Sequence, residues 1–213
     1  MPIKLDERLA ACAALVRREA RVADIGSDHA ILPCFLLQNG WTNITASDIN
    51  PKPLEHARKT LEKYGFGADT VRLVLSDGFE KIPPCDDVII AGMGGETISE
   101  ILTGCRYKDE NTRLILQPMT RHEELRRGLY RQGFEIISET FAYCSRKPYT
   151  VIYARFTGER REIDEAFAFI GKQDNPLYIN LQIMKIKKLS KGNPRFNALA
   201  EEITKEVKKL DSK

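Results

Sequence analysis

The chain of 213 residues lacks any long apolar run, and its net charge is small. No stretch approaches the roughly 20 apolar residues that cross a bilayer. The amino-terminal segment carries charges among its apolar positions instead of a compact signal-peptide core. We therefore expect a cytoplasmic protein with no membrane partner. The formal charge of +3 is too small to indicate a nucleic-acid partner by itself.

Metal and disulfide chemistry find little support in the sequence. The five cysteines are odd in number, form no CxxC pair and lie far apart among apolar neighbours, so we expect reduced thiols that mostly fill the core. The three histidines form no cluster with them along the chain, and we expect no metal site. These residues are Cys12, Cys34, Cys85, Cys105 and Cys144, and His29, His56 and His122.

Short apolar runs alternate with helix-like stretches between residues 22 and 156, after an amphipathic lead helix at residues 5–16. This alternation predicts a mostly parallel sheet with helices on both faces, a Rossmann-like α/β fold of the class I methyltransferase type. The last two strands are joined through Ala142 to Lys147, which is too short for a crossover helix, so they should pair antiparallel. The seven expected strands lie at residues 22–26, 44–48, 71–78, 87–92, 113–118, 134–143 and 149–156.

Several helix ends have local signals. Asn50 followed by Pro51 predicts an N-cap, and Thr120 with Glu123 predicts a capping box for a helix that begins near Arg121. Glycine is expected just after two helices. These glycines are Gly65 and Gly133.

The strand pattern stops after Phe156, and the remaining chain predicts three helices broken at Asn175-Pro176 and Asn193-Pro194. We divide the chain into a cofactor-binding domain at residues 1–157 and a small basic helical domain at residues 158–213. Residues 176–213 hold nine Lys or Arg against four acids, so their charges either contact phosphates or form a solvated helix face. The apolar set expected to dock this helical hairpin is Leu177, Leu181, Met184, the stem of Lys188, and Leu189.

The loop after the first strand holds one glycine, Gly26, where a dinucleotide fingerprint has three, so it is a poor cradle for a pyrophosphate. Ligands of parallel sheets bind at the carboxyl ends of the strands. The acids Asp24 and Asp28 there suit the positive sulfonium and amino groups of S-adenosylmethionine, and either could meet the amine. An NAD-dependent oxidoreductase is disfavoured by the missing glycines.

Two further acids follow the next strands. Asp48 lies about 20 residues beyond the glycine turn, where a carboxylate accepts hydrogen bonds from ribose hydroxyls, or it caps the helix at Pro51. Asp77, followed by Gly78, either accepts a bond from an adenine amino group or only forms a turn. Asp48 and Asp77 could thus bind the nucleoside half of a cofactor.

The segment from Ala91 to Gly95 follows the fourth strand with three glycines in four positions. Such a segment lets the backbone approach a bound group closely and lets a helix begin at once. The alternative is a simple tight turn, for which one glycine would normally suffice. We assign it to the edge that faces the substrate.

The motifs VADIGSDHAILP, SDINPKPLEHA, SDGFEKI, IIAGMGGETI and LILQP resemble, in this order, the TrmK family of bacterial methyltransferases. That family modifies N1 of the adenine at position 22 of tRNA, and the resemblance covers residues from about 5 to 156. It implies S-adenosylmethionine as cofactor, tRNA as partner, and a target base near Asp28 and His29. The expected cofactor contacts are Asp24, Ile25, Gly26, Ser27, Asp48, Ile49, Asp77, Gly78, Ala91, Gly92 and Met93, and the expected substrate edge comprises Asp28, His29, Gly92, Met93, Gly94 and Gln117.

N1 of neutral adenine has a free lone pair, so the reaction requires alignment and no base. We expect the glycine-rich segment and Gln117 to orient the adenine, with Asp28 and His29 as its polar partners. His29 alternatively only braces the loop. The competing functions are methyl transfer to another RNA or a small molecule, and a catalytically silent protein that binds cofactor or RNA as a regulator. Nothing in the sequence indicates the oligomeric state.

Overall fold

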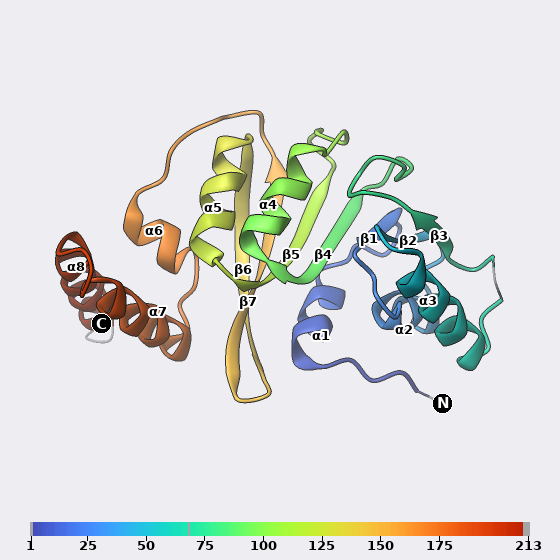
Figure 1. Cartoon of the computed structure of the whole chain (residues 1–213), viewed down its shortest axis with the longest axis horizontal. Helices are drawn as coiled ribbons and strands as arrows, with labels where there is room; N and C mark the ends of the chain where they lie inside the picture. Colours follow the sequence, from blue (N-terminus) through green and yellow to red (C-terminus); the bar gives the residue numbers. More distant parts are fainter. Residues whose placement is uncertain (1, 68, 211–213) are drawn as a thin grey trace.

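A computed structural model describes residues 2–67 and 69–210 and shows one seven-stranded sheet flanked by helices (Figure 1). The strand order is β3-β2-β1-β4-β5-β7-β6. All pairs from β3 to β5 are parallel, and β7 pairs antiparallel with both β5 and β6. The strands are β1 (Val22–Ile25), β2 (Ile44–Asp48), β3 (Arg72–Leu75), β4 (Asp87–Gly94), β5 (Arg113–Thr120), β6 (Phe134–Cys144) and β7 (Lys147–Phe156). The predicted seven-stranded, mostly parallel fold with a closing hairpin is confirmed.

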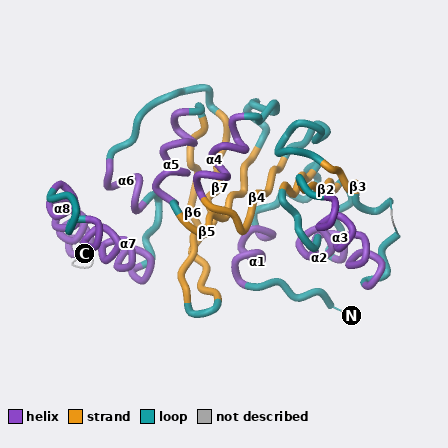
Figure 2. The backbone as a smooth tube through the Cα atoms, in the orientation of Figure 1, coloured by secondary structure: helices purple, strands orange, loops and turns teal. Residues whose placement is uncertain are grey.

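Helices cover both faces of the sheet (Figures 1 and 2). In β4, Val88 and Ile90 pack into the apolar cluster under α4 and α5, whereas Ile89 packs into the cluster shared with α1 and α2. The alternation of side chains along a strand explains why this strand is apolar at successive positions. The helices around the sheet are α1 (Glu7–Ala14), α2 (Ile31–Gln38), α3 (Pro51–Lys63), α4 (Gly95–Thr103) and α5 (His122–Arg131).

The β6–β7 hairpin turns through Ser145 and Arg146, which both have positive φ values of 48° and 62°. Two such residues match the twist of a two-residue hairpin turn. The outer part of the hairpin contacts the amino-terminal helix, because Ala11 of α1 packs against a small cluster of Ala142, Cys144 and Tyr149.

Three further helices follow the sheet: α6 (Glu165–Ile170), α7 (Pro176–Leu189) and α8 (Arg195–Leu210). They enclose an apolar cluster of their own. The predicted buried stripe of α7 is wrong, because Leu177, Leu181, Met184 and Leu189 are 41–66% exposed. The helix instead buries the neighbouring face. The buried residues of α7 are Tyr178, Ile179, Gln182, Ile183 and Ile186.

A buried ion pair connects these helices to the sheet. Arg126 of α5 and Glu139 of β6 are both fully buried, with 2.6 Å between Nη2 and Oε2. Arg126 also donates to the carbonyl oxygens of Ala168 and Phe169 in α6 and to the hydroxyl of Tyr178 in α7. One guanidinium therefore connects α5, β6, α6 and α7. The side chains of Lys208, Lys209, Asp211 and Lys213, which contribute to the predicted basic tail, lie outside the described residues.

One of the two predicted helix starts, the capping box of α5, is wrong, whereas α3 begins with Asn50 as N-cap and Pro51 in the first turn as predicted. The helix α5 begins after Arg121, whose φ of 54° is left-handed, and no side chain caps it. Glu123 pairs with Lys185 of α7, at 2.8 Å, so it cannot serve a capping box with Thr120. Asn50 occupies the N-cap position of α3, but its side chain makes no capping hydrogen bond. The C-terminal glycines, Gly65 and Gly133, have the predicted positive φ, 80° and 83°.

The five cysteines are buried and free, as expected. None of the helices that the structure describes has the length and apolar character that a bilayer crossing requires.

Candidate functional site: a cavity at the carboxyl ends of the strands

The backbone amides of the turn after β1 form hydrogen bonds within the protein. Gly26, with φ of 79°, and Ser27 both donate their N–H groups to the carbonyl oxygen of Ser47 at the end of β2, at 2.8 and 2.9 Å. Amides bonded in this way cannot bind a phosphate. The structure therefore agrees with the prediction that this turn is not a pyrophosphate cradle.

Asp24 at the end of β1 is a buried carboxyl group, 5% exposed. Burial raises its pKa to about 6, and a hydrogen bond from the Ser27 hydroxyl, at 2.7 Å, opposes this rise only in part. No Lys, Arg or His among the described residues forms an ion pair with Asp24. Asp24 is thus a carboxylate near neutral pH whose charge lacks a partner, and a cationic ligand group would stabilise it.

A cavity of about 750 Å³ lies beside this turn, at the carboxyl ends of β1, β2 and β3. Its volume is in the range of small-molecule and cofactor sites. The structure brings together seven of the predicted cofactor residues in its wall, whereas Asp24, Ser27, Ala91 and Gly92 do not line it. The seven are Ile25, Gly26, Asp48, Ile49, Asp77, Gly78 and Met93.

The sequence analysis missed the wall that α4 contributes. Thr97, Glu100 and Ile101 line the cavity, and Arg106 beyond the helix also reaches it. The available signal was that this helix follows the glycine-rich segment at once, so its first turns must lie at the ligand edge of the sheet. Phe79, next to the predicted Asp77-Gly78 pair, is a further lining residue that was missed.

Asp48 makes a local turn contact and also lies where a ligand contact is predicted. Its Oδ1 accepts a hydrogen bond from the Asn50 backbone N–H, at 2.9 Å, so Asp48 provides the turn bond ahead of α3. The same residue lines the cavity. A local structural role therefore does not compete with a ligand contact here.

The glycine-rich segment is part of a strand and not a loop. β4 continues to Gly94 with register shifts around Met93, and α4 begins directly at Gly95. A Cβ atom at Gly95 would lie 2.2 Å from the carbonyl oxygen of Arg121, so this glycine is required for backbone packing. Gly92 has φ of 81° and open space around its Cα. The prediction that a bound group approaches this segment closely therefore applies to Gly92 and not to Gly95.

Gln117 is completely buried on β5. Its Oε1 accepts from the Gly92 N–H at 3.2 Å and from Arg8 at 3.1 Å, and its Nε2 donates to the Pro118 carbonyl oxygen at 2.9 Å. These contacts hold the turn at Gly92 in place. A direct contact between Gln117 and a substrate base stays a prediction.

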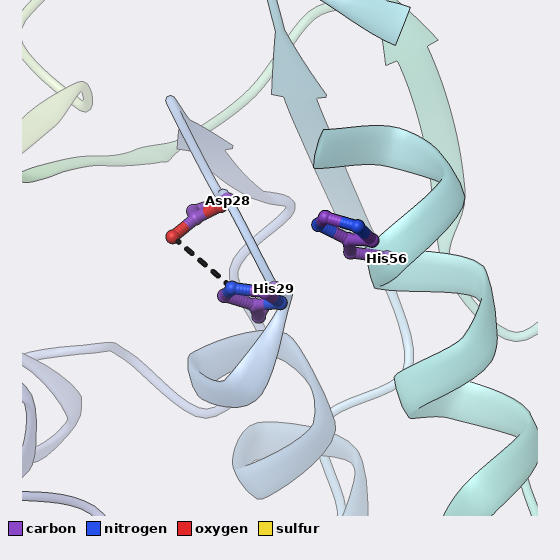
Figure 3. A group of neighbouring side chains, drawn as sticks. All are labelled: Asp28, His29 and His56. Atoms are coloured by element: carbon purple, nitrogen blue, oxygen red, sulfur yellow. Dashed lines mark ion pairs between the residues drawn. The ribbon is translucent and has the colours of Figure 1, made fainter. Parts of the chain in front are cut away.

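Asp28 and His29 lie in the turn between β1 and α2, shortly after Gly26, and do not line the cavity; their side chains are 68% and 55% exposed. Their carboxylate and imidazole atoms approach to 3.6 Å. The structure adds His56 of α3, whose ring stacks on that of His29 with 5.0 Å between centroids (Figure 3). Sequence spacing gave no indication of this histidine, which is 27 positions from His29.

The strand order, the acid after β2 and the occupied amides of the first turn define a Rossmann-like methyltransferase. The family model for the methyltransferase domain matches residues 5–152. A tRNA (adenine(22)-N(1))-methyltransferase from Bacillus subtilis is 32% identical over 190 residues, which cover 83% of this chain and 79% of that protein. The chain therefore belongs to the family of tRNA (adenine(22)-N(1))-methyltransferases.

Solved structures agree with this assignment. TrmK from M. capricolum, in complex with S-adenosyl-homocysteine, is 31% identical with a TM-score of 0.77 over 97% of this chain and 98% of its own. A Streptococcus pneumoniae protein solved in complex with S-adenosyl-L-methionine is 28% identical with a TM-score of 0.80, over 96% and 99% of the two chains.

Proposed function

We propose that this protein transfers the methyl group of S-adenosylmethionine to N1 of adenine 22 in tRNA. The observation that carries the proposal is the unpaired, buried carboxylate of Asp24 beside a nucleoside-sized cavity, in a chain of this family. A phosphate-bearing cofactor would require positive or donor groups at this turn, whereas a cationic one requires a carboxylate.

The residues present fit the cofactor. Asp24 would hold its amino group, Asp48 its ribose hydroxyls and Asp77 its adenine amino group. Gly26 packs closely against another residue of the cavity wall, because a Cβ atom at this position would lie 1.9 Å from Cε of Met93. When bound, the cofactor supplies a methyl group made electrophilic by its sulfonium.

At the substrate edge, the residues of this chain align N1 of the adenine with the methyl group. N1 of adenine needs no deprotonation, and orientation alone can lower a barrier by roughly 7–11 kcal/mol. The rigid turn at Gly92, held by Gln117, supplies one side of the base site. Asp28 stabilises the positive charge that develops on the adenine ring, and His29 is its polar neighbour.

The helical domain, residues 158–213, supplies the contacts with the tRNA backbone. Lys187, Lys188, Lys191 and Arg195 are exposed on α7, α8 and their connection. Such side chains bind phosphates and make the affinity fall with salt. The protein would act in the cytoplasm on free tRNA.

The test is transfer of labelled methyl groups to a tRNA transcript with adenine at position 22, followed by nucleoside analysis. We expect 1-methyladenosine in this transcript and none when position 22 is guanine. Asp28→Ala should lower the turnover at saturating tRNA. Full methylation of the guanine transcript, or no label in any tRNA, would overturn the assignment.

The contribution of α7 is tested separately by reversing two charges. Lys187→Glu with Lys188→Glu should raise KM for tRNA several-fold and leave KM for the cofactor unchanged. Lys4→Glu, an exposed reversal at the other end of the chain, is the matched control. An unchanged KM in the double variant would mean that these lysines only form a solvated helix face.

A further inference from the structure

Three side chains of metal-ligand type meet between the turn that follows β1 and the helix α3. Asp28 and His29 come from the turn after β1, and His56 comes from α3 (Figure 3). One ligand atom from each lies within 4.8 Å of the other two. The proposed methyl transfer does not require this convergence, since α3 is not part of the proposed substrate edge.

The backbone holds Asp28 and His29 in place at some energetic cost. Asp28 and Ala30, on either side of His29, have φ values of 42° and 52°. A left-handed conformation is unfavourable for a non-glycine residue and persists only where the surroundings enforce it. Ala30 is fully buried at the start of α2, so the fold enforces this conformation and turns His29 outward.

The three groups do not satisfy one another. Nε2 of His29 lies 3.6 Å from Oδ2 of Asp28, which is too long for a hydrogen bond. The His29 and His56 rings are stacked, with an interplanar angle of 10°, so the in-plane lone pairs do not face each other. Neither imidazole donates or accepts a hydrogen bond with a side chain or backbone group of another described residue. Their lone pairs are therefore available to a ligand.

We propose that Asp28, His29 and His56 form a binding site for a divalent transition-metal cation of the Zn²⁺ type. Two imidazoles with one carboxylate are the donors that zinc and its neighbours prefer, whereas Mg²⁺ and Ca²⁺ prefer oxygen ligands alone. Tetrahedral Zn²⁺ places its donors roughly 3.3 Å apart, given Zn–N distances of about 2 Å. Side-chain rotation of these partly exposed residues closes the remaining gap, and water completes the coordination.

Metal binding at this place has a consequence for the reaction that rests on the proposed function. A cation held by Asp28 and His29 removes both side chains from the target adenine and adds positive charge where the reaction creates more. The site therefore makes tRNA methylation sensitive to inhibition by Zn²⁺ through His56, a residue with no part in the methyl transfer itself.

The experiment titrates Zn²⁺ into tag-free protein, previously treated with EDTA, and measures heat release by calorimetry. We expect one Zn²⁺ per chain in the wild type. His56→Ala should bind at least tenfold more weakly, the scale of losing a ligand or its support. Glu62→Ala, an exposed change on the same helix, is the matched control and should bind like the wild type.

Methylation rates measured with and without Zn²⁺ give the second readout. In EDTA, His56→Ala should equal the wild type, and at a Zn²⁺ concentration that halves the wild-type rate it should retain its full rate. Absence of stoichiometric binding, or wild-type affinity in His56→Ala, would overturn the site. If the wild type methylates no tRNA even in EDTA, the proposed function fails, while calorimetry still decides the metal site.

Discussion

The buried carboxylate of Asp24 predicts that the protein becomes more stable when this cofactor residue is removed. Burial raises the pKa of Asp24 from 3.8 to about 6 without an ion-pair partner in the described chain. Asp24→Asn keeps the shape of the side chain and an oxygen that accepts the bond from Ser27. It removes only the charge.

The size of the expected gain in stability follows from the difference between the pKa of Asp24 in the folded state and in the unfolded state. Between pH 3.8 and 6, the folded protein retains a proton on Asp24 that the unfolded chain has lost, so the free energy of unfolding falls as the pH rises. Above pH 6 the full cost is present, and a shift of about two pKa units corresponds to about 3 kcal/mol. Asp24→Asn should therefore match the wild type near pH 4 and exceed it by about 3 kcal/mol at pH 8, or roughly 6–12 °C in Tm.

The assay compares urea unfolding of both proteins across this pH range, with and without S-adenosylmethionine. The cofactor should raise the free energy of unfolding of the wild type at pH 8 but hardly that of Asp24→Asn, because the variant lacks the carboxylate proposed to bind the amino group. The affinity of the wild type for S-adenosylmethionine should also weaken below pH 6, because a proton then competes with the cofactor's amino group for Asp24. An Asp24→Asn variant that is less stable than the wild type at pH 8, or a difference that does not shrink toward pH 4, would refute this reasoning.

Three further predictions concern stability. Gly95→Ala should lower the free energy of unfolding by at least about 2 kcal/mol because its Cβ meets the Arg121 backbone, whereas Gly104→Ala, with ordinary contacts, should stay within about 0.5 kcal/mol in the same urea titration. Arg126→Met should lower the free energy of unfolding by about 3–5 kcal/mol, because it leaves Glu139 buried without its partner. Adding Glu139→Leu should recover part of this loss, and no recovery would contradict the explanation that the loss comes from burying an unpaired charge. Burial lowers the pKa of His122 from 6.5 to about 4, so the unfolded chain gains a proton first as the pH falls, and this residue alone lowers the free energy of unfolding by up to about 3 kcal/mol over that range, against the opposite contribution of Asp24. His122→Gln should therefore gain stability relative to the wild type as the pH falls from 6.5 to 4, and a difference between the two proteins that does not change with pH would count against this.

The sequence predicted the sheet well because its signals are local and repeated. Burial of β4 on both faces of the sheet needs only the apolar run at Val88, Ile89 and Ile90, and positive φ after a helix needs only a glycine such as Gly65. Helix starts were less predictable. Glu123 has the spacing of a capping box, but Lys185 of a distant helix forms an ion pair with it, and no local pattern contains that partner.

The same distinction applies to the site and to the helical domain. Residues that follow strands, such as Gly26, Asp48 and Asp77, were predicted because the topology places strand ends together. His56 lies well inside a helix, so its approach to His29 depends on how α3 packs, which the sequence does not state. The buried face of α7 was misassigned because the apolar residues surround this helix, and periodicity alone selected Leu177 over Tyr178.

The contact between α1 and the β6–β7 hairpin has a consequence for how the chain folds. The residues that meet, such as Ala11 and Tyr149, lie at opposite ends of the sheet domain in sequence, so this contact closes a loop that contains nearly the whole domain. Contacts of such long sequence separation form late and slow folding. During synthesis, α1 therefore leaves the ribosome long before the hairpin that it contacts exists. Cys12 and Ala13 can pack against earlier elements such as α2, whereas the surface around Ala11 stays uncovered until the final strand arrives.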